Sequence, residues 1–258
     1  VPYLFPHPGL LGELPLDEPA ATAARAGRWC FDTMTLVGPG TWEAARGAID
    51  AALTATDLVV AGAPAAYACC RPPGHHATRD AYGGSCYLNN AAAAAGALRD
   101  ATGGPVAILD IDAHHGNGAQ SIFWSDGEVV TGSVHVDPGA GWFPHFLGFG
   151  SERGAGDGAG ANLNLPLAPG SGDGPWLEAA ASLCELARDS GARSLVVALG
   201  VDAAAADPES PLAVTAAGYR AAGEQLGALG LPTVVVQEGG YDLGAIGELV
   251  VATLEGLA

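Results

Sequence analysis

The chain of 258 residues carries 28 acidic residues against ten basic ones, so its formal net charge is −18 at pH 7. A surface this acidic repels phosphate backbones, and nucleic acid is therefore not an expected partner. The same charge would attract a small polycation, or would serve only to keep the protein in solution. Although 49% of the residues are hydrophobic, no apolar run approaches the ~18 residues of a membrane span, so no membrane partner is expected.

From Trp42 onward, short apolar runs alternate with longer segments rich in Ala and Leu, a pattern typical of βα units around a mostly parallel sheet. The sequence predicts a single α/β domain over residues 1–258, doubly wound, with helices on both faces of the sheet. Strands are expected at Ala65–Cys70, Val106–Ile111, Val129–His135, Leu195–Leu199 and Thr233–Gln237. Helices are expected at Trp42–Ala55, Asn89–Arg99, Asn117–Trp124, Pro175–Arg188, Ala216–Leu229 and Leu243–Leu257.

Two stretches lack clear periodicity. Residues 1–41 contain many Gly and Pro and form an atypical amino-terminal segment. Residues 137–174 are rich in Gly, Pro and aromatic side chains, and we expect a long ordered loop there, close to the functional site.

The five cysteines are odd in number, lack CxxC spacing and mostly lie in apolar surroundings. Reduced, buried thiols of this kind are typical of cytosolic proteins. The first residues also lack the basic and apolar regions of a secretory signal. We therefore expect a cytoplasmic location.

Ionisable residues follow two of the predicted strands at the point where each strand ends. Asp110, Asp112 and His114 alternate after an apolar run, so in an extended chain they would project to one side. Asp202 follows another apolar strand, and parallel sheets bind ligands at such carboxyl ends. Taken singly, Asp112 and Asp202 would more often cap helices. Together with His114 they offer two carboxylates and one imidazole, which leaves a coordination position open, as in catalytic zinc sites.

Two further motifs fit the same cavity. His75 and His76 follow Arg-Pro-Pro-Gly at the end of the first clear strand, where one imidazole could act as general base and the other assist. Tyr241 follows Glu-Gly-Gly after the last strand, and its phenol could donate a hydrogen bond to an oxyanion, although a lone Tyr is more often a packing residue.

Five separated runs occur in the order RPPGHHA, GGSCYLNNAA, LDIDAHHGNG, DP with SPL, and EGGYDL. In this order they resemble the zinc-dependent histone deacetylase superfamily, which includes acetylpolyamine amidohydrolases and acetoin-utilisation proteins and has the arginase/deacetylase fold. The resemblance covers residues 40–258. The run from Asp137 to Gly148 looks more like the acetylpolyamine and bacterial class II-like branch than the class I enzymes.

The resemblance implies specific roles for the residues named above. Asp112, His114 and Asp202 match the zinc ligands, and Fe(II) could occupy the same donors. His75 and His76 match the catalytic imidazole pair. Their supporting residues are Asp110 for His75 and Asn117 for His76, and Tyr241 matches the tyrosine that stabilises the oxyanion. Because Asn117 is neutral, His76 should hold a proton less readily than it would beside a carboxylate.

A structural monovalent cation, K⁺ in this family, is implied at the backbone of Asp110, Asp112 and His114 with Ser133 and Val134. Around the substrate, Phe143 matches one aromatic wall of the acyl-lysine tunnel, and Gly84 and Ser85 fall on the opposite wall. The family usually has Phe or Tyr where this chain has Ser85, so a bulkier acyl group or a different amine could fit. His135, at a strand end, is expected to be a hydrogen-bonded structural residue.

These expectations define a zinc-dependent amidohydrolase whose first candidate substrate is a small acetylated amine or polyamine. A protein lysine deacylase with the same mechanism is the alternative, and a non-catalytic protein that keeps the metal pocket is a third reading. An arginase-like dimanganese enzyme is weaker, because His115, Gly116 and Asn117 stand where that family has a different run. The oligomeric state stays open, a homo-oligomer included.

Overall fold

One parallel sheet of six strands, in the order β1-β6-β5-β2-β3-β4, organises the chain. It is seen in a computed structural model that describes residues 20, 21, 25 and 28–258, and the rest of the atypical segment over 1–41 lies outside the described residues. The strands are β1 Ala65–Ala68, β2 Val106–Asp110, β3 Val129–Val136, β4 Asn162–Leu167, β5 Ser194–Leu199 and β6 Thr233–Gln237.

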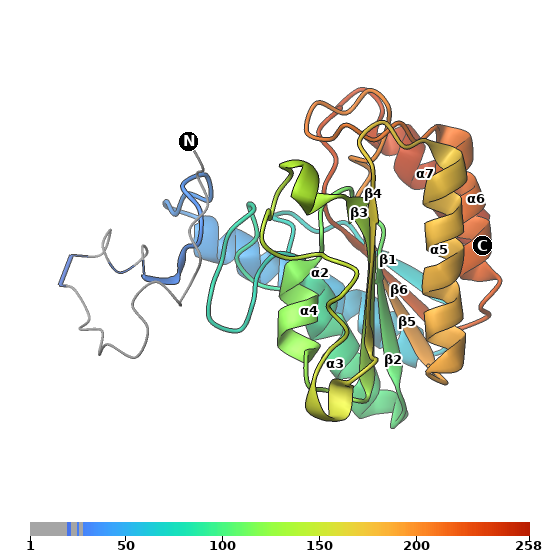
Figure 1. Cartoon of the computed structure of the whole chain (residues 1–258). Coiled ribbons are helices and arrows are strands. Elements are labelled where there is room, and N and C mark those ends of the chain that lie inside the picture. The colour runs from blue at the N-terminus through green and yellow to red at the C-terminus, as the bar shows by residue number, and fades with distance from the viewer. Residues whose placement is uncertain (1–19, 22–24, 26–27) are drawn as a thin grey trace.

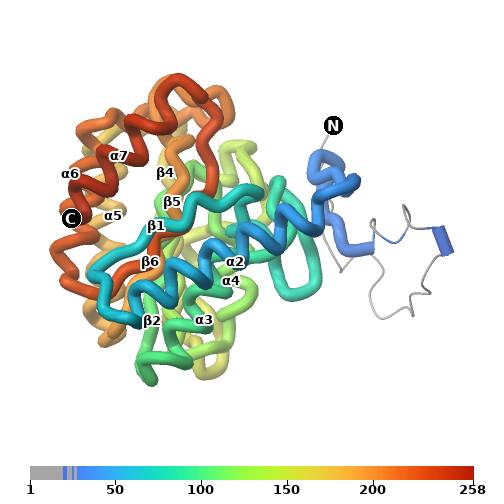
Figure 2. The backbone as a smooth tube through the Cα atoms, turned by 180° about the vertical axis from the view of Figure 1, so that it is seen from behind, coloured from blue at the N-terminus to red at the C-terminus, as the bar shows by residue number. Residues whose placement is uncertain are grey.

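Helices cover both faces of this sheet, as the alternating pattern predicted. Figure 1 shows α2, α3 and α4 on one side and α5, α6 and α7 on the other. From behind, α2 runs along β1 (Figure 2). Their bounds are α2 Thr41–Val60, α3 Asn90–Thr102, α4 Asn117–Phe123, α5 Asp173–Asp189, α6 Ala216–Gly227 and α7 Ile246–Leu257. Within the described part of the chain, the helices are too short or too polar to cross a bilayer.

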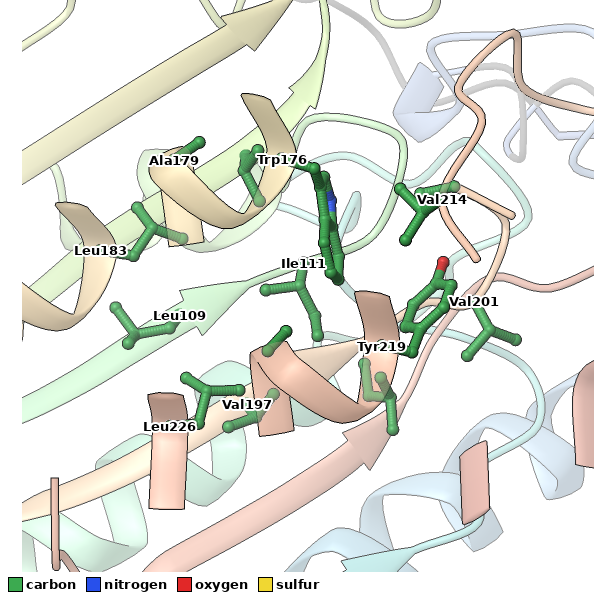
Figure 3. Close-up of a cluster of buried hydrophobic side chains, with 14 of the residues drawn as sticks. Leu109, Ile111, Trp176, Ala179, Leu183, Val197, Val201, Val214, Tyr219 and Leu226 are labelled. Carbon is green, nitrogen blue, oxygen red and sulfur yellow. The ribbon is translucent and has the colours of Figure 1, made fainter. Parts of the chain in front are cut away.

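Two apolar cores form because successive strand residues point to opposite faces. On β2, Leu109 joins the core under α5 and α6, whereas Ile108 joins the core under α2 and α3. The first core centres on Trp176 and Tyr219, whose rings meet edge to face with centroids 5.0 Å apart (Figure 3). Both faces of the central strands are therefore dry, which explains their continuous apolar sequences.

The expected loop over residues 137–174 is wrong in its second half. Strand β4 occupies Asn162–Leu167, pairs with β3 and forms one edge of the described sheet, and α5 begins at Asp173. The connection that remains is Asp137–Ala161, with two short 3₁₀ turns. Helix α7 also starts later than expected, because Asp242 forms a turn by accepting from the backbone N–H of Gly244.

The core predicts a large cost for truncating Leu98, which is fully buried between α3 and the sheet. Leu98→Ala should lower the free energy of unfolding by about 2–5 kcal/mol, because it removes apolar contacts and leaves a cavity. Leu58→Ala is the control, since Leu58 is 54% exposed on α2. Urea unfolding that gave equal losses for the two variants would contradict this packing.

Candidate metal and catalytic site

The strand order brings four loops of the sequence to one place. Strands β1, β6, β5 and β2 are consecutive neighbours in the sheet, and each is followed at its carboxyl end by ionisable residues. His75 and His76 follow β1, Glu238 follows β6, Asp202 follows β5, and Asp112 follows β2. Parallel strands place these ends along a single edge, where such sheets commonly bind ligands.

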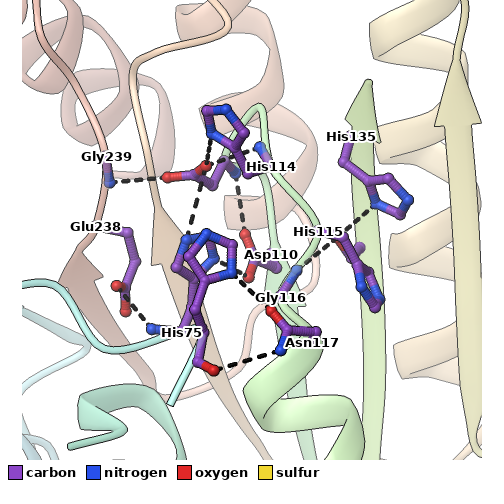
Figure 4. Close-up of polar contacts among 12 residues, drawn as sticks. His75, Asp110, His114, His115, Gly116, Asn117, His135, Glu238 and Gly239 are labelled. Carbon is purple, nitrogen blue, oxygen red and sulfur yellow. Dashed lines mark hydrogen bonds and ion pairs between the residues drawn. The ribbon is translucent and has the colours of Figure 1, made fainter. Parts of the chain in front are cut away.

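Asp112, His114 and Asp202 form a convergent set of donors. Each offers one ligand atom, and these atoms lie within 4.8 Å of one another. Nδ1 of His114 is 3.0 Å from Oδ2 of Asp202 and 3.3 Å from Oδ1 of Asp112. Both carboxylates are fully buried, and the His114 side chain is 12% exposed. His114 is seen in Figure 4.

This set fits a divalent cation on the chemistry of its donors. Burial and then the charge of Asp112 raise the pKa of Asp202 to about 6, because two carboxylates share a dry site. Burial lowers the pKa of His114, but its bonds to both carboxylates more than offset this and raise it to about 10. Buried charges of one sign call for a partner, and two carboxylates with one imidazole match a zinc site with an open position.

Two glycines let the backbone approach these carboxylates. The backbone N–H of Gly239 donates to Oδ2 of Asp112 at 2.8 Å. A Cβ at Gly200 would collide with the Asp112 carboxyl group, and one at Gly239 would lie 2.5 Å from Oδ2 of Asp202. Gly200, directly after β5, and Gly239, two residues after β6, are therefore required because a larger residue would not fit.

The tandem histidines lie side by side, with ring centroids 4.0 Å apart. Nδ1 of His75 is 2.9 Å from Oδ2 of Asp110, and Nδ1 of His76 is 2.7 Å from Oδ1 of Asn117 (Figure 4). The amide nitrogen of Asn117 donates to the His76 carbonyl, so its oxygen is the atom that faces the ring. Because a carbonyl oxygen only accepts, Nδ1 of His76 carries the proton and Nε2 keeps a lone pair.

These different partners drive the pKa values of the two imidazoles apart. Burial lowers the pKa of His75, but the carboxylates of Asp112 and Asp110 outweigh it and hold that pKa well above the usual value. Burial and then the nearby positive charge of His75 hold the pKa of His76 well below it. The pair therefore combines a protonated imidazole, His75, with a neutral one, His76, that can accept a proton.

A pocket of about 150 Å³ is lined by His114, one of the three converging donors. It brings together the sequence-predicted His76, Gly84, Ser85, His114, Phe143 and Tyr241 with three residues that sequence reasoning missed, Asp32, Met34 and Glu209. A larger cavity of about 660 Å³ lies at the opposite end of β1 and β6, but the described residues that line it include no Asp, Glu, His or Cys. Of these two cavities, only the smaller is lined by Asp, Glu and His side chains that could take part in a reaction.

The lining of this pocket includes one aromatic ring, Phe143, and a turn of small residues, Gly84 and Ser85. The Phe143 ring meets His76 edge to face, with centroids 4.6 Å apart. Ser85 lines the same pocket, adopts a left-handed φ of 63° and is exposed. A Cβ at Gly84 would collide with the His76 ring. Phe143 and Gly84 thus both lie against the His76 ring. The role of Phe143, Gly84 and Ser85 in binding a substrate stays a prediction.

Asp32 fastens the amino-terminal segment to this wall. Its carboxylate accepts from the backbone N–H groups of Met34 and Thr35, both at 2.8 Å, and from that of Gly84 at 2.5 Å. Thr35 in turn accepts from the backbone N–H of Ser85. The local signal is the spacing Asp-x-x-Thr, which is typical of side-chain turns, but nothing local shows that this turn would meet the loop at Gly84.

Tyr241 is held at the rim by a second such carboxylate. Oδ2 of Asp207 accepts from the backbone N–H groups of Tyr241 at 2.7 Å and Asp242 at 3.1 Å, and Oδ1 accepts from that of Glu209 at 3.0 Å. The Tyr241 side chain is 43% exposed and borders the pocket. Burial and the charges of Asp202 and Asp112 raise the pKa of its phenol, so the hydroxyl keeps its proton.

The connection that carries Phe143 is anchored from behind the donor set. Nε2 of His135 lies 2.8 Å from the carbonyl oxygen of Gly148, and Nδ1 lies 2.8 Å from the Ser133 hydroxyl, so His135 has the hydrogen-bonded structural place that was expected. Glu152 accepts from the backbone N–H of Gly148 and from the side chains of Gln120 and Asn164.

The residues of the expected monovalent cation site are also neighbours. Asp110 pairs with Ser133 in the register of β2 and β3, and the backbone N–H of Val136 donates to the carbonyl of Ala113. The backbone of residues 110–114 therefore lies alongside Ser133 and Val134. Cation binding there stays a prediction.

The chain belongs to the histone deacetylase domain family, whose model matches residues 13–257. This confirms the superfamily and the fold that the sequence motifs predicted, and it defines the class of enzyme as a hydrolytic deacetylase. An acetylpolyamine amidohydrolase of Mycoplana ramosa is 43% identical over 240 residues, which cover 93% of this chain and 70% of that protein. Acetylpolyamine amidohydrolase 1 of Pseudomonas aeruginosa is 43% identical over 92% of this chain and 68% of its own length. A crystal structure of an acetylpolyamine aminohydrolase from Burkholderia pseudomallei superposes with a TM-score of 0.86 at 45% identity, covering 89% of this chain and 67% of that one.

The close approach at Gly200 predicts that Gly200→Ala weakens metal binding, because the new Cβ must displace the Asp112 carboxyl group. We expect zinc affinity to fall about 10- to 100-fold, the usual cost of disturbing groups that orient a ligand. Gly96→Ala on α3 is the control, since a Cβ there meets nothing within 4 Å. Zinc content after dialysis against a competing chelator measures the effect, and wild-type affinity in Gly200→Ala would refute the assignment of Asp112.

Proposed function

We propose that the protein is a zinc-dependent amidohydrolase that removes the acetyl group from a small acetylated amine or polyamine. One observation carries the proposal: the donor atoms of Asp112, His114 and Asp202 converge, and His114 lines the same pocket as His76 and Tyr241. The similarity to acetylpolyamine amidohydrolases over most of the chain supports the choice of substrate.

Asp112, His114 and Asp202 would hold the zinc ion. A zinc ion bound by these donors supplies Lewis-acid chemistry, polarising an amide carbonyl and a water molecule. Fe(II) accepts the same donors, so metal content and metal-dependent turnover must be measured together.

The two imidazoles would have different roles: His76 would move protons, and His75 would hold its own. His76 borders the pocket, and its free Nε2 can take a proton from the attacking water and pass it to the leaving amine. His75 keeps its own proton through Asp110, and its positive charge stabilises the negative charge that develops during attack. Tyr241 would donate its hydroxyl proton in a hydrogen bond to the acyl oxygen when that oxygen becomes negative.

The charge of the pocket mouth favours a cationic substrate. Glu209 is exposed at the pocket and adds a carboxylate where the amine end of an acetylated polyamine would emerge. The net charge of −18 would draw a polycation toward the whole surface. An acetyl-lysine peptide presents the same amide on a similar aliphatic chain, and Met34 and Leu243, 61% and 86% exposed near Tyr241, would suit its flanking residues.

Turnover distinguishes these substrates. The zinc-loaded protein should hydrolyse acetylputrescine or acetylspermidine faster than an acetyl-lysine peptide, as measured by release of the free amine. Tyr241→Phe should lower kcat on the order of 10²-fold, because it removes one oxyanion donor. Turnover of the peptide alone would make the protein a lysine deacylase. No turnover of any acyl amide by protein with stoichiometric zinc would refute the proposal.

Glu209→Gln tests the recognition of the amine. It should raise KM for acetylspermidine about two- to fivefold, the range of an exposed ion pair, and leave kcat unchanged. Glu185→Gln, on the exposed side of α5, is the matched control, because it changes net charge equally at a site away from the pocket. Added salt should reduce the effect of Glu209→Gln. Equal changes in KM for the two variants would show that only overall charge matters.

A further inference from the structure

Glu238 is a buried carboxylate that the proposed mechanism leaves without a role. It follows β6 and is 6% exposed. Its Oε2 accepts from the backbone N–H groups of Gly74 at 2.6 Å and His75 at 3.0 Å (Figure 4). Oε1 is buried and has no hydrogen-bond partner among the described residues. An acidic side chain is rarely buried this far unless it does something there.

The two N–H groups belong to the turn that carries the imidazole pair. Three hydrogen bonds hold His75. Its backbone N–H donates to Glu238, its carbonyl accepts from the backbone N–H of Gly118 at 2.9 Å, and its ring bonds to Asp110. Glu238 is the only one of these three that reaches the turn from β6, across 163 residues of sequence. Gly74 has no room to move toward α3, because a Cβ there would collide with the Asn90 backbone.

The next residue connects the same segment to the metal donors. Gly239 donates its backbone N–H to Asp112, one residue after Glu238 receives the N–H groups of the histidine turn. The backbone of 238–239 thus spans the distance between the imidazole pair and the donor set. If the hydrogen bonds from Gly74 and His75 to Glu238 were lost, the segment after β6 would no longer fix the position of His76 relative to Asp112 and His114.

We propose that Glu238 is a positioning residue for the imidazole pair, acting through the hydrogen bonds that its carboxyl oxygen accepts from Gly74 and His75. This inference rests on the proposed function. The proposal assigns this role to the acceptor oxygen and to the reach of the side chain. Burial raises the pKa of Glu238 to about 7.

Three substitutions separate these contributions. Glu238→Gln keeps an acceptor oxygen at the same reach and removes the charge, Glu238→Asp keeps the charge but is one methylene shorter, and Glu238→Ala removes both. On acetylputrescine, Glu238→Gln should keep kcat within about threefold of wild type. Glu238→Asp and Glu238→Ala should each lose about 10²-fold in kcat with KM nearly unchanged, because a shift of about 1 Å in a reacting group costs that much.

A second measurement does not depend on turnover. Hydrogen exchange of the Gly74 and His75 amides should be about fivefold faster in Glu238→Asp and Glu238→Ala and unchanged in Glu238→Gln, because a lost hydrogen bond costs about 1 kcal/mol. If the wild-type protein were inactive on every amide, the proposed function would fail while exchange still tested the contact. Glu238→Ala is checked for folding by its unfolding midpoint, and the Gln and Asp variants decide the question if it does not fold.

Two results would overturn the inference. Full activity in Glu238→Asp with none in Glu238→Gln would show that the charge acts directly on His75. The ligand atoms of His75, Cys86 and Glu238 also lie within 4.8 Å of one another. Loss of a second equivalent of bound zinc in Glu238→Gln, measured as metal per chain, would therefore make Glu238 a metal ligand and not a positioning residue.

Discussion

Burial of several carboxylates at one edge of the sheet is the constraint on which the rest of the structure depends. Asp110, Asp112, Asp202 and Glu238 are each at most 6% exposed. Charge in a dry interior is tolerated only when it is paired or hydrogen-bonded. In this protein the partners are imidazoles and backbone N–H groups that belong to the surrounding loops. The same contacts that compensate the buried carboxylates therefore also hold the loops that form the pocket.

Carboxylates that accept backbone N–H groups also occur at the rim of the pocket, farther from the candidate metal donors. Asp32 joins the amino-terminal segment to the Gly84 turn, and Asp207 joins the Glu209 loop to Tyr241. Each acid fixes backbone that belongs to a different connection of the sheet. The pocket wall is irregular in secondary structure yet specified in position, because side-chain acceptors replace the hydrogen bonds that a helix or strand would supply.

Where sequence reasoning failed, the local pattern was weak or the partner was distant. Strand β4 reads Asn-Leu-Asn-Leu-Pro-Leu between Gly-rich segments, and its alternation is interrupted by Pro166, which an edge strand tolerates. The places of Asp32 and Glu209 at the pocket depend on contacts across the fold. The pair Asp110 and His75 was foreseen only through family resemblance, since periodicity cannot say which acid meets which ring.

The apolar pattern of the sequence was enough to predict the buried strands and the helices between them, and the acids and histidine after two of these strands marked candidate metal donors after β2 and β5. These features could be predicted because buried strands and helices require recognisable apolar patterns in the sequence, and because a parallel sheet places the carboxyl ends of its strands at one edge. The position of β6 between β1 and β5 became known only from the folded chain. That neighbourhood brings Glu238 to the histidine turn and Gly239 to Asp112. These contacts join residues more than a hundred positions apart, and no local propensity encodes them.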